Sequence, residues 1–506
     1  MTTRRSQGRG DELQRPSELA RRLDPSLLRG HFALGRSLPV EPAGWERREL
    51  GGWILLHDPG LPALDLVDDS GRMGWVLGHP ADLDARKLVT GALRVSAAGD
   101  RPGFEDRLYA HGGRYAVVAL RPAPWLYPDA AASLPVFFDA ELRAASSSPF
   151  LLASEDGSVP DSELVEALAV FRTGSWFPLG ATPHGNATRL LPNHVLDLTS
   201  WSQTRRWPTA PFERDEVSAS VERVAAALEG TLAAAAESLR PNVGFTAGGD
   251  SRTFLACARP TLDRLGFFTV AFPDELGKTD LHTAPRLAQS LGLDYRILPW
   301  RPATDRDVAL FMYRTGCMVG ERRGRLGGPS YAQLGGAQPY VSGVGAEMAR
   351  GIGWRKHDQP GMRLSAEELL TRFGFASHPD LVRRAEEWLG ALPELDALDA
   401  LTLFHFEMRF GCWGSSLTTC YPDAYTFTLY PYAHRTVIDA VLRLPWQYRG
   451  SGRMRNDLIA ARRPELLRFG INRPPLGVQA MRIARRGVRV VGGGVRRAVR
   501  RGGRRG

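Results

Sequence analysis

The chain has 506 residues, of which 43% are hydrophobic, and its formal net charge is +10. No apolar run approaches the ~20 residues that a helix needs to span a bilayer, and residues 1–7 lack the apolar stretch of a secretory signal peptide. The sequence therefore argues against membrane-spanning and secreted proteins, and we expect a cytoplasmic location. The length leaves room for two or three domains, each large enough to bury a core.

Residues 1–28 are polar and rich in arginine, and we expect them to form a loose lead-in. Residues 30–205 alternate short apolar runs with Gly, Pro and Asp turns, which is typical of stacked antiparallel sheets. The clearest apolar runs are 53–56, 75–77, 115–120 and 136–138. The prolines at 208 and 211 mark a linker that ends the first domain, residues 29–207.

The second domain, residues 212–475, is predicted to alternate helices and strands. Helix 215–239 opens it, with Asp215 as the expected N-terminal cap. Strand 267–272, helix 280–291 and strand 295–298 follow, and the chain from 363 to 412 is expected to be largely helical. This alternation predicts an α/β fold with a doubly wound parallel sheet, whose ligands bind at the carboxyl ends of the strands.

The rest of the chain adds a basic tail and four cysteines. Residues 482–506 contain ten arginines and no acidic residue, so the remainder of the chain is close to neutral. We expect residues 476–506 to form a solvated, low-complexity extension, and contact with an anionic surface or partner is the alternative. The cysteines form no C-x-x-C pair, so reduced buried thiols and no zinc site are predicted.

Residues 243–252, Val-Gly-Phe-Thr-Ala-Gly-Gly-Asp-Ser-Arg, are the most informative stretch. They predict a buried strand that turns at Gly248 and Gly249 into a helix. Such a turn presents backbone N–H groups at the positive end of a helix, which suits a pyrophosphate, and glycine permits close approach of the backbone. Asp250 is placed to hold a magnesium ion against the phosphates. A purely structural turn is the alternative.

The stretch resembles the pyrophosphate-binding loop of the ATP pyrophosphatases, Ser-Gly-Gly-x-Asp-Ser, and within them that of the asparagine synthetase family. In an alignment on the Asp-Ser pair, Gly248 matches, whereas Thr246 replaces the serine and Ala247 replaces the first glycine. The resemblance implies that the phosphates of ATP are bound by six residues: Thr246, Ala247, Gly248, Gly249, Asp250 and Ser251.

A second stretch, Val-Ser-Gly-Val-Gly-Ala-Glu-Met-Ala-Arg-Gly at 341–351, resembles the family motif Ser-Gly-Glu-Gly-Ala-Asp-Glu. Gly343 and Gly345 match, while Val344 and Met348 replace two glutamates. Glu347 stands where the family has a magnesium-binding aspartate. The resemblance implies that the two glycines lie beside the phosphates and that Glu347 shares the magnesium ion with the aspartate of the first loop.

A third stretch, residues 431–458, resembles the C-terminal motif of the family, which carries a cation to the reacting phosphate. That cation is usually a lysine, but none of the three lysines of this chain lies in the motif. Arg455 occupies the aligned position and Arg453 lies close by, so the resemblance implies catalytic roles for both. Arginine stabilises phosphate charge but does not readily transfer a proton, and a plain surface charge is the alternative for Arg455.

With further similar strands at 113–120, 135–139 and 189–197, the resemblance extends from about residue 30 to residue 475. It implies an Ntn-hydrolase-like, glutaminase-type domain followed by an adenine nucleotide alpha hydrolase-like domain. Asparagine synthetases release ammonia from glutamine with a cysteine at the processed N-terminus, whereas residue 2 here is threonine. We therefore expect a glutaminase fold without glutaminase activity.

The function implied by the resemblance is an ATP-dependent amide ligase that forms AMP and pyrophosphate, with ATP and Mg²⁺ as cofactors. Its partners would be a small-molecule or peptide carboxylate and an amine donor that the sequence does not identify, and a second copy of the chain is a further candidate. Lactam or lasso-peptide cyclases, which also lack the cysteine, and a non-catalytic nucleotide-binding scaffold are the alternatives. A sulfur-inserting enzyme is disfavoured because no catalytic cysteine pair is present.

Overall fold

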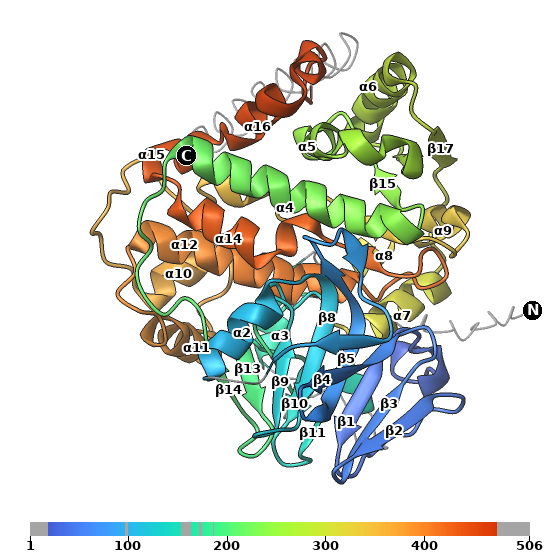
Figure 1. Ribbon diagram of the computed structural model, residues 1–506, viewed down its shortest axis with the longest axis vertical. Helices are drawn as coiled ribbons and strands as arrows, with labels where there is room; N and C mark the ends of the chain where they lie inside the picture. Colours follow the sequence, from blue (N-terminus) through green and yellow to red (C-terminus); the bar gives the residue numbers. More distant parts are fainter. Residues whose placement is uncertain (1–18, 97–99, 153–162, 172–174, 186, 473–506) are drawn as a thin grey trace, which may run out of the picture.

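The computed structural model describes residues 19–96, 100–152, 163–171, 175–185 and 187–472. It shows a mixed α/β chain in which antiparallel sheets precede a parallel sheet, and this part of the predicted fold class is confirmed. Figure 1 shows the strands of the antiparallel sheets gathered at the bottom of the molecule, with most of the helices above them. Thr2 and the whole predicted basic tail lie outside the described residues.

Two antiparallel sheets form the first part of the chain. The first has the strand order β12 (Thr188–Arg189), β10 (Phe137–Asp139), β11 (Ala144–Ser146), β1 (Phe32–Gly35), β3 (Trp53–His57) and β2 (Glu46–Leu50). The second has the order β14 (Ser202–Arg205), β13 (His194–Asp197), β9 (Trp125–Pro128), β8 (Gly112–Ala119), β5 (Gly71–Asp82), β4 (Ala63–Asp68) and β7 (Ala92–Arg94), with β6 (Lys87–Leu88) beside β5. The β4–β7 pair is parallel.

The two sheets stack face to face, because side chains alternate between the two faces along each strand and one face of each sheet is apolar. In β5, Trp75 and Leu77 enter the core between the sheets, whereas Val76 points to the opposite face. There it packs with Phe104 and Leu108 of α2 (Arg101–Tyr109). The result is a sandwich with a helix on one outer face.

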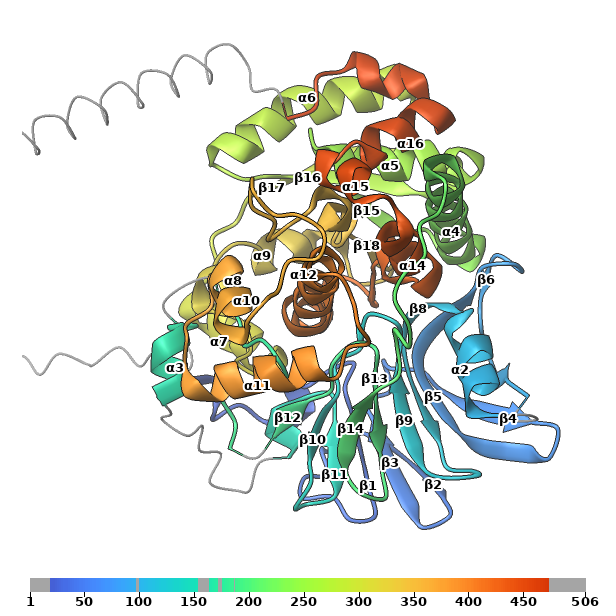
Figure 2. The ribbon, with the colours of Figure 1, turned by 90° about the vertical axis from the view of Figure 1, so that its left-hand side faces the viewer.

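The parallel sheet has the order β17 (Tyr295–Pro299), β16 (Gly266–Ala271), β15 (Asn242–Gly244), β18 (Tyr340–Val341) and β19 (Thr428–Leu429). Neighbouring residues of β16 serve different cores, since Phe267 packs with the helices of the main core and Phe268 packs with a cluster of tyrosines on the other face. Both faces of the sheet are therefore covered, as a doubly wound sheet requires. Figure 2 shows the helices that surround it.

The helices of the second part fall into three runs along the chain. The first run is α4 (Val217–Ser238), α5 (Gly249–Cys257), α6 (Glu275–Leu291), α7 (Asp305–Arg314), α8 (Glu321–Gly324) and α9 (Gly328–Tyr331). The second is α10 (Ala366–Arg372), α11 (Pro379–Gly390), α12 (Ala397–Phe406), a π-helical turn (Glu407–Gly414) and α13 (Ser415–Leu417). The third is α14 (Arg435–Arg443), α15 (Trp446–Ser451) and α16 (Met454–Arg462). The predicted helical character of 363–412 is confirmed. Within the first part of the chain, a short helix α3 (Glu163–Leu168) precedes β12.

Three local expectations are wrong. The segment 19–28 is not a loose lead-in, because Ala20 and Leu28 are fully buried in a cluster with residues of α7. Asp215 does not cap α4; its carboxylate binds Arg223 at 2.8 Å instead, and the helix begins at Val217. The helix expected at 280–291 begins earlier, at Glu275.

That earlier start has a clear cause. The side chain of Asp274 accepts a hydrogen bond from the N–H of Gly277 at 2.7 Å and so caps α6.

Among the described residues, no helix is long and apolar enough to cross a membrane. The four cysteines are buried and free, as predicted.

Candidate functional site

The two loops predicted to face the phosphates leave the parallel sheet at the same edge. The strand order reverses between β15 and β18, and in such sheets ligands bind at the carboxyl ends of the strands at this reversal. The loop after β15 leads to Asp250, and the loop after β18 contains Gly343. A Cβ built on Gly343 would lie 3.2 Å from the Cβ of Asp250. The fold thus brings two stretches almost a hundred positions apart into contact.

Hydroxyl groups hold the first loop in shape. Thr246 Oγ1 accepts a hydrogen bond from the N–H of Gly248 at 3.1 Å, and Ser251 Oγ accepts one from the N–H of Thr246 at 3.2 Å. Gly248 is the N-cap of α5 and has no side chain to accept from the first turn. Because the first N–H groups of a helix lack intrahelical acceptors, this turn is suited to bind an anion.

Ala247 connects the first loop to other parts of the chain. Its N–H donates to the Asp280 carboxylate of α6 at 2.7 Å, and its carbonyl accepts from Arg252 at 3.3 Å and from the N–H of Asn472 at 3.0 Å. Burial raises the pKa of Asp280, while the hydrogen bond from Ala247 opposes that rise. Hydrogen bonds to α6 and to Asn472 therefore fix the conformation of the loop together.

Arg252 adds further hydrogen bonds between the first loop and the segment that ends at Asn472. Its side chain is fully buried, and its guanidinium donates to the backbone carbonyls of Ala247, Leu466, Phe469 and Gly470. No carboxylate is among these acceptors, so the cation is held entirely by peptide dipoles. The segment 466–472 is thereby tied to the phosphate-side loop.

Arg455 extends from α16 across the start of α5. A Cβ on Gly249 would overlap its Nε, Cδ and Cζ atoms, so only glycine leaves room for the guanidinium there. Its Nη1 lies 3.6 Å from Asp250 Oδ1, and its Nε is buried without a hydrogen-bond partner among the described residues. A buried donor without an acceptor, next to a helix N-terminus, is suited to bind an anion.

Asp250 lies among charges of both signs. Arg350 Nη2 donates to its Oδ1 at 2.9 Å, and the side chain is 37% exposed. Burial is the largest influence and raises the pKa of Asp250; Arg350 and Arg455 counteract it, and the nearby Glu347 adds to it. The influence of Glu347 indicates that the two carboxylates lie close enough to repel each other.

Glu347 lies in a short 3₁₀ helix, Ala346–Arg350, directly after the second loop. Its Oε2 accepts from the N–H of Gly345 at 3.0 Å, and its Oε1 accepts from Arg409 Nε at 3.0 Å. Burial favours the neutral acid, but Arg409, the backbone N–H of Glu347 itself and His405 outweigh it and hold the pKa of Glu347 below its ordinary value. Gly345 has φ +98°, a conformation that glycine adopts without strain.

The carboxylates at this site could hold a magnesium ion only together with phosphate oxygens or water. The described residues hold no group of three or more His, Cys, Asp or Glu side chains placed around a metal. Mg²⁺ is commonly held by one or two carboxylates together with phosphate oxygens and water, and Asp250 and Glu347 supply two. Each of them now pairs with an arginine, Arg350 and Arg409, so metal binding would have to compete with both pairs.

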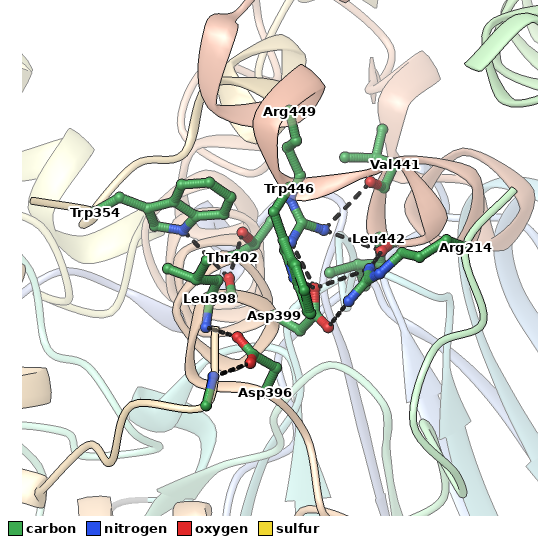
Figure 3. A network of polar contacts seen from close by, with 11 residues as sticks. Arg214, Trp354, Asp396, Leu398, Asp399, Thr402, Val441, Leu442, Trp446 and Arg449 are labelled. Carbon is green, nitrogen blue, oxygen red and sulfur yellow. Dashed lines mark hydrogen bonds and ion pairs between the residues drawn. The ribbon is translucent and has the colours of Figure 1, made fainter. Parts of the chain in front are cut away.

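A buried ion network holds the elements that carry Arg455 and Glu347 (Figure 3). Asp399 of α12 accepts from Arg449 Nη2 at 2.5 Å and from Trp446 Nε1 at 3.2 Å, and Arg214 pairs with its other oxygen. Arg449 is 0% exposed, and it also donates to the carbonyl of Leu442 at 3.0 Å. Because Trp446 and Arg449 lie on α15, the network fixes the helix that precedes α16.

Trp354 connects the same network to the second loop. Its Nε1 donates to the carbonyl of Leu398 at 3.2 Å. A Cβ on Gly351 would come within 2.8 Å of its ring, and a Cβ on Gly450 would come within 3.0 Å. The indole therefore packs between the end of the 3₁₀ helix and α15. The 3₁₀ helix carries Glu347, and α15 precedes the helix that carries Arg455, so Trp354 helps to position both residues.

Of the predicted site residues, the structure brings together those of the first loop with Gly343, Gly345, Glu347 and Arg455. It does not bring Arg453 there: this side chain is 69% exposed and pairs with Asp457 at 3.8 Å. The sequence reasoning did not single out several partners of the site: Arg252, Asp280, Arg350 and Arg409. Arg252 and Arg350 lie inside the quoted stretches, so their position beside the motifs was an available signal.

No protein-family model matches the chain, and no curated protein matches it either. The resemblance to the asparagine synthetase family therefore depends on the motifs themselves. The structure adds an observation that does not depend on the resemblance: the first loop, the start of α5 and Arg455 meet where the strand order of the parallel sheet reverses.

Proposed function

We propose that this chain is an ATP-dependent amide ligase similar to the asparagine synthetases, which adenylates a carboxylate and joins it to ammonia or an amine with release of pyrophosphate and AMP. The proposal includes the finer fold assignments, an Ntn-hydrolase-like first domain without the glutaminase reaction and an adenine nucleotide alpha hydrolase-like second domain. The observation that carries it is the meeting of two glycine loops, a helix N-terminus and Arg455 at the strand-order reversal.

In this proposal the residues divide the work by charge. The N–H groups at the start of α5 and the Ser251 hydroxyl bind the β- and γ-phosphates. Arg455 neutralises the charge that grows on the departing pyrophosphate, and it is already held in place before the reaction, which is what electrostatic stabilisation requires. Asp250 and Glu347 would hold Mg²⁺, which supplies charge neutralisation at the phosphates when bound. Arg453 is too exposed to share the role of Arg455.

Binding of Mg·ATP tests the proposal directly. Calorimetry should detect Mg·ATP binding to the parent chain and at least a hundredfold weaker binding to Asp250→Asn, by analogy with other preorganised electrostatic groups. Asp263→Asn is the matched control, because Asp263 is an exposed aspartate outside the site. Equal affinity in Asp250→Asn and the parent would contradict the proposal.

A second candidate function is a nucleotide-binding scaffold without catalysis. It is favoured by the two arginine pairs, Asp250–Arg350 and Glu347–Arg409, which occupy both proposed metal ligands. Incubation with Mg·ATP and a panel of carboxylates and amines separates the two functions. A ligase, including a lactam or lasso-peptide cyclase, releases pyrophosphate and AMP, whereas a scaffold binds the nucleotide and releases neither.

A further inference from the structure

A cavity opens on the outer face of the second antiparallel sheet, beside α2. Residues of α2, β5, β8 and β9 and of the loop 121–123 line it, and its volume is about 340 Å³. Pockets that hold small organic molecules begin at about 300 Å³. In both ribbon views α2 lies beside the antiparallel strands, well apart from α5 (Figures 1 and 2). A ligand of this cavity, called the α2 cavity below, is therefore distinct from the proposed nucleotide.

The inner walls of the α2 cavity are apolar and largely aromatic. Trp125 and Tyr127 lie two positions apart on β9 and so face the same side of the sheet. The ring of Phe104 on α2 lies 5.6 Å from that of Tyr127 between centroids, and the buried Met73 also lines the cavity. Aromatic and thioether side chains pack well against flat rings. Since an apolar cavity of about 150 Å³ holds one benzene molecule, the α2 cavity has room for two fused rings.

Two of the three charged residues that line the α2 cavity are arginines. The described lining contains Arg101, Arg121 and one acidic residue, Asp100. Asp100 is already engaged, because its carboxylate accepts from the N–H of Gly103 at 3.0 Å and caps α2. Arg121 is 49% exposed and lies 3.8 Å from Asp68. Arg101 is therefore the cation that a ligand deep in the cavity would meet.

Arg101 has fewer acceptors than its guanidinium can use. Its Cζ lies 3.4 Å from the centre of the Trp125 ring, and its Nε pairs with Glu105 at 3.0 Å. The same carboxylate oxygen of Glu105 lies 3.0 Å from Arg206 Nε, so one carboxylate serves two guanidinium groups. Nη2 of Arg101 is buried without a hydrogen-bond partner among the described residues. Such a donor is costly, and an acidic group in the cavity would supply the acceptor.

We infer that the α2 cavity binds a planar aromatic acid with a body of two fused rings and one carboxylate. The rings would pack against Phe104 and Tyr127, and the carboxylate would accept a charge-assisted hydrogen bond from Arg101. A neutral ring compound forgoes that bond. An acid with a flexible chain loses more conformational freedom on binding and lacks the flat faces that suit the walls. The inference does not depend on the proposed ligase activity.

The compound 2-naphthoate is the probe for the α2 cavity. We expect calorimetry on the full chain to detect its binding, about tenfold tighter than that of 2-naphthamide or decanoate. The amide keeps the rings and removes the charge, whereas decanoate keeps the charge and removes the flat faces. Equal binding of 2-naphthamide would overturn the role of the cation, and equal binding of decanoate would overturn the role of the aromatic walls. No binding of 2-naphthoate would overturn the whole inference.

Two arginines of the same domain supply the matched variants. Arg101→Gln should weaken 2-naphthoate binding about tenfold, because a hydrogen bond between charged groups is lost. Arg94→Gln makes the same change at an exposed position of β7 outside the cavity and should alter binding less than about twofold. Circular dichroism checks that both variants fold, and the comparison of acid with amide in the parent decides the question if one does not. Parent-like affinity in Arg101→Gln would overturn the inference.

Measurement of Mg·ATP in parallel separates this inference from the proposed function. The affinity for 2-naphthoate should be the same with and without Mg·ATP, because the two ligands occupy different parts of the molecule. Displacement of 2-naphthoate by Mg·ATP would place the acid at the nucleotide site and overturn the inference. Binding of 2-naphthoate without any binding of Mg·ATP would support the α2 cavity and contradict the proposed function.

Discussion

The guanidinium of Arg455 lies directly over Gly249, at a distance that leaves no room for a Cβ at that residue. The cation comes from α16 and the glycine from the first turn of α5, more than two hundred positions earlier. The contact places a positive side chain on the positive end of a helix, an arrangement that an anion between or beside them would stabilise.

Substitution of that glycine should therefore act through Arg455. In Gly249→Ala the methyl group displaces the guanidinium, and we expect Mg·ATP affinity to fall about tenfold, to the level of Arg455→Ala. The double variant should be no weaker than either single one, since residues in contact are not additive. Gly390→Ala, where a Cβ meets open space, is the control. Additive losses, measured by calorimetry, would show that the two residues act separately.

Glu347→Gln tests the second predicted metal ligand. We expect turnover, followed as pyrophosphate release, to fall by roughly two orders of magnitude, because the neutral amide is a poor ligand for a hard cation. Glu386→Gln changes the same charge at an exposed position of α11 and should leave turnover unchanged. Turnover within a fewfold of the parent would mean that Glu347 only anchors Arg409.

Asp399→Asn tests the network of Figure 3. Removal of this carboxylate leaves the fully buried Arg449 without its counter-ion, and breaking a buried pair in this way costs about 3–5 kcal/mol. Urea denaturation should show that loss, whereas Asp263→Asn should change the free energy of unfolding by less than about 0.5 kcal/mol. An Asp399→Asn chain as stable as the parent would show that the network contributes little.

Stability should also fall in mild acid because of buried histidines. Burial lowers the pKa of His31 from its ordinary value of 6.5 to about 3, so below pH 6.5 the unfolded chain binds a proton that the folded chain does not. Stability is therefore lost as the pH falls from 6.5 toward 3, by about 3 kcal/mol for this group at pH 4.5.

His31→Asn isolates the contribution of that side chain, because asparagine keeps a polar group near Ser147, the present partner of His31 Nδ1. Melting temperatures measured from pH 7 to pH 4.5 should decline less steeply in the variant than in the parent. Parallel curves would show that His31 does not cause the acid sensitivity.

The chain should not hydrolyse glutamine. A threonine hydroxyl is a far weaker nucleophile than a cysteine thiol unless a base is held against it, and residue 2 lies in a polar, arginine-rich segment. Labelled glutamine, incubated with and without Mg·ATP and carboxylates, should yield no glutamate above background. Glutamate release that disappears in Thr2→Ala would show a working amidotransferase.

The sequence was sufficient for features whose cause is local. Gly248 and Gly249 predict a turn, and the alternation of strands with helices predicts a parallel sheet. The position of the loop at the carboxyl edge of that sheet was therefore predictable from the sequence. Arg453 shows the limit of this reasoning. Residues two positions apart near a helix start point in different directions, so Arg455 reaches the loop while Arg453 lies in solvent.

Partners that meet through tertiary structure were not predictable from the sequence pattern. Asp280 binds the first loop only because α6 returns across the sheet, and its identity as an aspartate in a helix carries no such signal. The pairing of Glu347 with Arg409 likewise depends on the π-helical turn that follows α12. Helix periodicity predicts the existence of such helices but not which of their charges meet.

The carbonyl cage around Arg252 has a consequence for the order of events during synthesis. Three of its four acceptors belong to residues 466–470, and the N–H that completes the loop at Ala247 comes from Asn472. A nascent chain that contains the glycine loop but not yet these residues lacks three of the four carbonyls that accept from Arg252. The loop can reach its final form only after residue 472 has been translated, so a half-synthesised chain still lacks the contacts that shape the proposed nucleotide site.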